Sequence, residues 1–133
     1  MRLYLDANAI IYCVEGASAF RTAVLSRISP VEQDPAGLLV TSRLSRLECR
    51  VRPMKEGNAL LLETYEAFFS KRGLLVAEVS PQVIEVATEL RAKYGFRTPD
   101  ALHLATAQVE RADAILTGDR TLARCTEVRV ELL

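Results

Sequence analysis

Short apolar segments that alternate with helix-like stretches constrain the fold of this 133-residue chain more than any other feature. Strand-like segments lie at residues 2–5, 38–41, 74–79, 112–117 and 127–130. Between them, apolar residues at helical spacing predict helices at residues 7–13, 18–28, 43–51, 55–71, 81–93 and from 98 onward. This alternation is typical of an α/β fold with three layers, in which helices cover both faces of a mostly parallel sheet. The length predicts a single domain spanning residues 1–133.

Prolines and glycines set the expected ends of these elements. The stretch 30–37 (PVEQDPAG) is predicted to be a loop, and Pro53 to end the helix before it. Gly73 stands where a helix C-cap is expected. We expect the hydroxyl of Thr98 to cap the next helix, with Pro99 at its first position.

The composition excludes several classes of protein but does not identify the function. Seventeen basic and seventeen acidic residues give no net charge, so nucleic-acid binding must depend on local arrangement. Three cysteines and one histidine argue against a zinc site or a disulfide framework and favour the cytoplasm. No leader and no apolar run of about 20 residues is found, so no membrane association is expected. The apolar share of 50% fits either a homo-oligomer interface or a large core.

Two aspartates come directly after predicted strands. Asp6 follows the apolar segment LYL, and Asp119 follows AILTG. Ligands of open parallel sheets bind beyond the carboxyl ends of the strands, so both are candidates for an active site. The alternative interpretation is that each only caps a helix.

Two further carboxylates complete the candidate set. Helical spacing places Glu48 on one face with Leu44, Leu47 and Val51, opposite three arginines. A glutamate on an apolar face requires a cation or a hydrogen-bond donor, and a buried salt bridge is the alternative. Asp100 lies in the first turn of a helix, where the helix N-terminus alone explains a carboxylate.

Four carboxylates in one pocket would repel one another unless a divalent cation neutralised them. Oxygen-only ligands, without a histidine or cysteine cluster, indicate Mg²⁺ or Mn²⁺. Such a site suits hydrolysis of a phosphodiester, because the metal activates a water and stabilises the attacking and leaving oxygens.

With these residues in place, the chain resembles the PIN-domain ribonuclease family, and within it the VapC-type toxins of type II VapBC toxin–antitoxin modules. The likeness lies in four ordered blocks that span almost the whole chain. They are YLDANAIIY (4–12), TSRLSRLECR (41–50), RTPDALHLATA (97–107) and LTGDRTL (116–122).

The resemblance implies that the four carboxylates are the acidic metal ligands of the family: Asp6, Glu48, Asp100 and Asp119. It also matches polar supporting positions, which have structural explanations as caps and turn residues: Asn8, Ser42, Ser45 and Thr117. Gly118 and Thr121 depart from the pattern, since relatives often carry Asn and Asp there, and this bears on how firmly a second metal ion is held.

The resemblance further implies an endoribonuclease that forms a homodimer and is inhibited by a cognate VapB-type antitoxin in the active-site groove. Among the arginines, Arg97 and Arg120 adjoin candidate ligands and are the preferred RNA-binding residues over a simple solvated surface. His103 is interpreted as a satisfied, partly buried histidine rather than a catalytic base.

Two other functions compete with this interpretation. A non-catalytic PIN-like binding module would keep the fold without the activity, although all four carboxylates are retained. A phosphatase of the haloacid-dehalogenase type is suggested by the Asp6-Ala7-Asn8 start, but Asn8 cannot transfer a proton and no convincing lysine motif follows.

Overall fold

A five-stranded sheet forms the centre of the molecule in the computed structural model, which describes all residues from 1 to 133. The strand order is β3-β2-β1-β4-β5, and every neighbouring pair is parallel. The strands are β1 (Arg2–Leu5), β2 (Leu38–Ser42), β3 (Leu74–Ala77), β4 (Ala114–Thr117) and β5 (Val130–Leu132). The predicted mostly parallel sheet is therefore confirmed.

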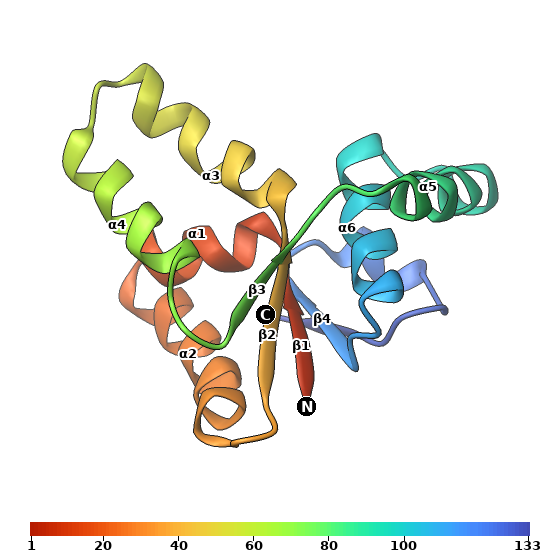
Figure 1. Cartoon of the computed structure of the whole chain (residues 1–133), viewed down its shortest axis with the longest axis horizontal. Helices are drawn as coiled ribbons and strands as arrows, with labels where there is room; N and C mark the ends of the chain where they lie inside the picture. The colour runs from red at the N-terminus through yellow and green to blue at the C-terminus, as the bar shows by residue number, and fades with distance from the viewer.

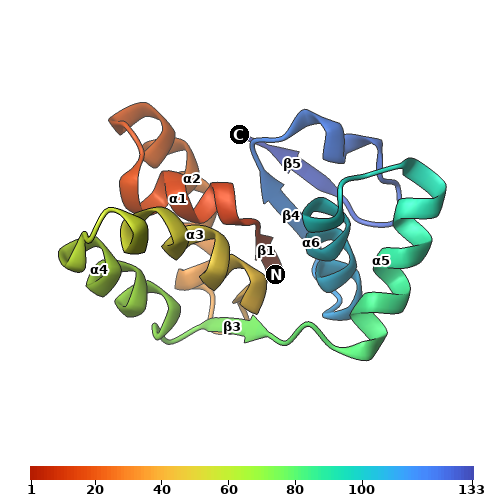
Figure 2. The same cartoon turned by 90° about the horizontal axis from the view of Figure 1, so that it is seen from above.

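Helices cover both faces of this sheet, which confirms the three layers (Figures 1 and 2). One face carries α1 (Ala7–Glu15), α2 (Ser18–Gln33), α3 (Arg43–Lys55) and α4 (Ala59–Phe69). The other carries α5 (Pro81–Tyr94), α6 (Thr98–Val109) and the short 3₁₀ helix η1 (Arg120–Arg124). No single helix has the length and apolar composition of a membrane span; only α1 and α2 taken together do, and they meet at 119°.

The strands direct alternate side chains into two separate cores. Leu3 and Leu5 pack under α1 to α4, whereas Tyr4 between them packs under α5 and α6. In β4, Leu116 belongs to the first core and Ile115 to the second. Such strands read as continuous apolar runs because both faces of a parallel sheet are covered.

Two prolines do not end helices as predicted. The expected loop at 30–37 is wrong in its first part, because α2 continues through Pro30 to Gln33. Its buried stripe of Val24, Ile28 and Val31 extends past the proline and offsets the lost hydrogen bond. Likewise, α3 continues past Pro53, whose ring is buried, to Lys55.

Three predicted helix ends also differ from the structure. The helix expected at 55–71 begins only at Ala59, because Asn58 accepts a hydrogen bond from the backbone N–H of Leu61 at 3.1 Å. Its C-cap is Ser70, whereas Gly73 adopts a left-handed φ of 79° just before β3. Arg97 is the N-cap of α6, so the expected cap by Thr98 is wrong, and Pro99 lies at the second position of the helix rather than the first.

Candidate active site

Asp6 lies at the carboxyl end of the central strand β1, where it is the N-cap of α1. Its Oδ1 accepts a hydrogen bond from the N–H of Ala9 at 2.8 Å. The residue is only 5% exposed. Burial raises the pKa of this carboxyl, Glu48 raises it further, and the hydrogen bonds from Thr117 and Ala9 oppose the shift.

Thr117, the last residue of β4, connects two of the candidate carboxylates. Its hydroxyl donates to Oδ2 of Asp6 and accepts the backbone N–H of Asp119 at 3.0 Å. The side chain is fully buried. β1 and β4 are neighbouring parallel strands, so the expectation that Asp6 and Asp119 share one sheet edge is confirmed.

Asp119 and Asp100 line one pocket beside α6 and η1. The pocket has a volume of about 310 Å³, and its lining includes Arg97, Arg124 and Thr121. Asp119 caps η1, since its Oδ1 accepts from the N–H of Thr121 at 2.9 Å and from the hydroxyl at 2.8 Å. Asp100 accepts a hydrogen bond from Nε of Arg97 at 3.2 Å. Asp6 and Glu48 do not line this pocket.

The face predicted for Glu48 is wrong. Leu47 and Val51 are more than half exposed, and the residues of α3 that are buried are Ser45, Cys49 and Pro53. The small side chains of Ser45 and Cys49 let α3 pack closely on the molecule, with Sγ of Cys49 3.8 Å from the carbonyl of Ala7. The apolar stripe of α3 therefore faces solvent, and Glu48 lies between the two faces.

Glu48 is nevertheless held toward the interior by a histidine. Its Oε1 accepts from Nε2 of His103 at 2.6 Å, and Nδ1 of His103 lies 2.7 Å from the hydroxyl of Tyr4. His103 is 4% exposed and Tyr4 is fully buried. The prediction of a satisfied histidine is confirmed, with burial deeper than expected. Its contact with Glu48 corresponds to the buried salt bridge considered for Glu48 and is an ion pair only when the imidazole is protonated.

The supporting residues have unequal roles. Ser45 is fully buried and 2.8 Å from the hydroxyl of Thr41, which donates to the carbonyl of Leu5. Ser42 caps α3, as predicted, by accepting from the N–H of Leu44. Asn8 is exposed on α1 and its side chain makes no hydrogen bond.

Basic residues surround the pocket in a pattern that the sequence predicted only in part. Arg97 lines the pocket, but the exposed Arg120 does not. Arg124 lines it instead and donates to the carbonyl of Tyr94 at 2.9 Å. Arg120 and Arg124 lie at the two ends of η1, and the sequence alone does not indicate which of them faces the pocket.

The sequence profile described as PIN domain matches residues 3–128, which is nearly the whole chain. The chain belongs to the PIN domain family. The matched region contains the four candidate carboxylates, so the whole candidate site lies inside the PIN domain. No curated protein sequence matches the chain.

Solved structures share this PIN fold over almost the full chain. VapBC2 of Rickettsia felis, bound to a promoter DNA fragment, has a TM-score of 0.80 at 16% identity and covers 100% of this chain and 99% of its own. A toxin–antitoxin complex of Klebsiella pneumoniae has a TM-score of 0.65 at 23% identity and covers 95% of this chain and 94% of its own. VapC20 of Mycobacterium tuberculosis, a toxin that cleaves the sarcin–ricin loop, has a TM-score of 0.70 at 17% identity. It covers 96% of this chain and 98% of its own.

The four carboxylates of this PIN domain fit a divalent cation by chemistry but are held apart in the structure. All four donors are carboxylate oxygens, which Mg²⁺ and Mn²⁺ prefer. No three His, Cys, Asp or Glu side chains lie close enough together to hold one metal ion. The contacts with His103, Arg97 and Thr121 each orient one carboxylate separately.

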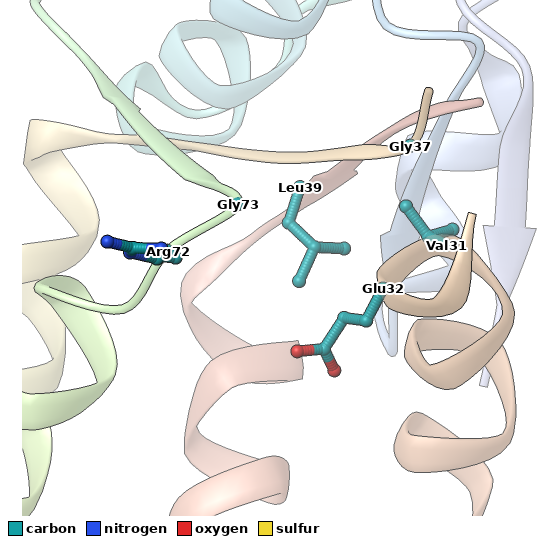
Figure 3. Close-up of a pocket in the computed structure, with 6 residues that line it drawn as sticks. All are labelled: Val31, Glu32, Gly37, Leu39, Arg72 and Gly73. Carbon is teal, nitrogen blue, oxygen red and sulfur yellow. The ribbon is translucent and has the colours of Figure 1, made fainter. Parts of the chain in front are cut away.

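A second hollow in the PIN domain lies near the start of β2 and β3, away from the carboxylates. It has a volume of about 90 Å³. Figure 3 shows its lining from α2, from the start of β2 and from the turn before β3. The carboxylate of Glu32 is paired with Lys71 at 2.8 Å. The space is smaller than the pocket at Asp100 and Asp119, and no cluster of candidate ligands accompanies it.

Asp6→Asn is expected to stabilise the metal-free protein at neutral pH. Because the pKa of Asp6 is raised on folding, its contribution to stability is fully present below the unfolded pKa and is lost as pH rises through the folded value. The amide carries no charge to bury, so we expect Tm to rise by about 2–5 °C at pH 7. The gain should shrink toward pH 4, as measured by calorimetry in EDTA. A Tm that falls equally at both pH values would contradict this assignment.

Proposed function

We propose that this PIN domain is an endoribonuclease dependent on Mg²⁺ or Mn²⁺, with residues 1–133 acting as one nuclease domain. The observation that carries the proposal is the arrangement at the carboxyl ends of β1 and β4. There, Asp6 and Asp119 are joined through Thr117, and Asp119 shares its pocket with Asp100 and two arginines.

Four residues would hold the cation: Asp6, Glu48, Asp100 and Asp119. When bound, the ion supplies an activated water and stabilises the charge on the phosphodiester oxygens. The raised pKa of Asp6 supports this assignment, because a buried carboxylate without a cation is costly. Asp100 and Asp119 must turn from their present partners, Arg97 and Thr121, toward a common point with Asp6 and Glu48 for the cation to bind.

The other residues of the site would orient the Asp6 carboxylate and bind RNA. Thr117 and the N–H of Ala9 fix both oxygens of Asp6, so this carboxylate keeps its orientation. Arg97 and Arg124 give the acidic pocket positive groups that can contact phosphates on either side of the scissile bond. Arg120, which is exposed next to Asp119, extends this surface beyond the pocket.

The biological role that we propose is that of a VapC-type toxin in a type II toxin–antitoxin module, acting in the cytoplasm. The PIN family match and the toxin–antitoxin structures of the same fold support this role. We further propose that a cognate VapB-type antitoxin covers the pocket at Asp100 and Asp119. The three free cysteines of the PIN domain are compatible with a reducing compartment.

The exposed apolar stripe on α3 supports a homodimer. Leu47, Val51 and Met54 are 58%, 55% and 61% exposed, and the first two would usually face a core. Arg46 and Arg50 line the same surface but are already bonded, to Glu66 and to the carbonyl of Arg46. A second copy could cover the stripe with Arg46 already paired, provided that the guanidinium of Arg50, which has no carboxylate partner, stays at the solvated rim of the interface. Two-fold dimers are the commonest assembly.

Leu47→Asp is expected to convert the dimer to a monomer, because the new charge would lie inside the interface without a partner. Light scattering after gel filtration should give twice 14.7 kDa for the wild type and 14.7 kDa for the variant. Leu60→Asp is the matched control, since Leu60 is exposed on α4 outside this surface. A wild type that stays monomeric at all concentrations, or a dimeric Leu47→Asp variant, would refute the interface.

Sequencing of RNA ends after induced expression tests the nuclease function in cells. We expect new, discrete 5′ ends with the wild type and none with Asp6→Asn at equal protein level. Identical end profiles for the two proteins would exclude RNA cleavage by this site. The position of the new ends would also identify the RNA target.

A second candidate function is a PIN-like binding module without catalysis. The specific observation in its favour is that no three potential ligands lie close enough to hold one ion. This function predicts RNA binding that is unaffected by Mg²⁺, Mn²⁺ or EDTA and no cleavage under any of these conditions.

A further inference from the structure

A chain of two hydrogen bonds connects the buried core with the carboxylate of Glu48. It begins at Tyr4 in β1, passes through His103 in α6 and ends at Oε1 of Glu48 in α3. The three residues are far apart in sequence and come from three elements. Tyr4 and His103 are buried, whereas 30% of the Glu48 side chain is exposed.

The chemistry of these groups fixes the direction of both hydrogen bonds. An ionised carboxylate only accepts, so Nε2 of His103 must carry a proton and donate to Glu48. In the neutral ring, Nδ1 is then an acceptor, and the hydroxyl of Tyr4 donates to it. Burial raises the pKa of Tyr4 well above its usual range, so its proton is retained. If the ring is protonated, Nε2 still donates, and Glu48 is held in both cases.

The hydrogen bond from His103 leaves one oxygen of the Glu48 carboxylate free. Oε1 is engaged by His103, whereas Oε2 has no hydrogen-bond partner in the protein. Asp100 and Asp119 are each oriented by a residue close in sequence, Arg97 for Asp100 and Thr121 for Asp119. Asp6 and Glu48 are each oriented by a buried side chain from another element, Thr117 for Asp6 and His103 for Glu48, and of these two only Glu48 keeps an oxygen without a hydrogen-bond partner.

We propose that His103, itself oriented by Tyr4, is a positioning residue that holds Oε1 of Glu48 and presents Oε2 to a divalent cation. This inference rests on the proposed function, because it assumes that Glu48 is a metal ligand. Partners that hold a ligating carboxylate typically change metal affinity about 10- to 100-fold when they are replaced. His103 has no part in proton transfer to RNA in this role.

The test measures binding of Mn²⁺ alone to the full chain by isothermal titration calorimetry, with Tm recorded for each variant. We expect His103→Leu to weaken Mn²⁺ binding about 10- to 100-fold. His103→Gln, whose amide can still donate to Glu48, should recover most of the affinity. Tyr4→Phe should weaken binding less than His103→Leu, because the imidazole remains but loses its orienting partner.

A double-mutant cycle separates positioning from packing. In a Glu48→Gln background, His103→Leu should cause no further loss of Mn²⁺ affinity if it acts through Glu48. Equal Mn²⁺ affinity of His103→Leu and the wild type would overturn the inference, even if Tm falls. Equal losses with His103→Leu and His103→Gln would also overturn it, because packing would then explain the effect. A wild type that neither binds Mn²⁺ nor cleaves RNA would instead refute the proposed function itself.

Discussion

Asp6→Asn and Asp100→Asn are each expected to lower the rate of Mg²⁺-dependent RNA cleavage about 1,000-fold. Each change removes one anionic oxygen ligand, and metal-ion catalysis contributes several kcal/mol to stabilising the transition state. Since each 1.4 kcal/mol corresponds to a tenfold change in rate, a loss near three orders of magnitude follows. The measurement is single-turnover cleavage of an RNA oligonucleotide at saturating Mg²⁺.

Asp34→Asn provides a matched control for this prediction. Asp34 is exposed at the end of α2, where it contacts the N-terminal amine and the N–H of Ala36. Its substitution should leave the cleavage rate within about twofold of the wild type, since surface changes of this kind seldom have large effects. Wild-type rates for both Asp6→Asn and Asp100→Asn would show that the proposed site is wrong.

Thr117→Val is expected to destabilise the metal-free protein by about 2–4 kcal/mol. Valine has nearly the same shape, but it removes the hydroxyl that donates to Asp6 and accepts from the N–H of Asp119. Each buried polar group left without a partner costs about 1–3 kcal/mol. For a chain of this size, Tm should fall by about 8–16 °C by calorimetry.

Thr117→Ser is the informative comparison, because it retains the hydroxyl and loses only a methyl group. We expect it to cost less than half as much as Thr117→Val. Loss of the hydrogen bond should also raise the pKa of Asp6 further, so the deficit of Thr117→Val should grow as pH rises from 4 to 8. Equal stability of the two variants would mean that packing, rather than the hydrogen bonds, gives Thr117 its importance.

The fold could be predicted from the sequence because local signals and tertiary packing agree along most of the chain. The central strands β1, β2 and β4 are short apolar runs buried on both faces, and each of the first four strands is followed by a helix. Two of the errors fall at Pro30 and Pro53, where a local rule predicts a helix end and tertiary burial overrides it. Val31 lies beyond the first proline and is 3% exposed, which explains why the helix continues.

The candidate site was predicted with unequal success. Asp6 and Asp119 follow neighbouring parallel strands, so the rule about strand ends was enough to bring them to one edge. The face of Glu48 was predicted wrongly because an apolar stripe on a helix indicates that this face is covered but does not identify what covers it. Leu47 and Val51 are exposed on this chain, and Cys49 faces its core instead.

The hydrogen bonds around His103 lie beyond what one sequence can reveal. Tyr4 and His103 are 99 positions apart, and His103 and Glu48 are 55 apart. Only the packing of α6 against the sheet and of α3 at the end of β2 brings them together. A tyrosine hydroxyl directed into a buried core is the one local signal, since such a group requires a partner.

Binding of Mn²⁺, measured together with RNA cleavage, tests the central claim most directly. The wild type should bind Mn²⁺ saturably, and its cleavage rate should rise over the same concentrations and vanish in EDTA. Asp100→Asn should weaken binding at least tenfold and shift or abolish the activity in parallel. Cleavage that persists in EDTA, or Mn²⁺ binding that is unchanged in Asp100→Asn, would contradict a nuclease centre built from these carboxylates.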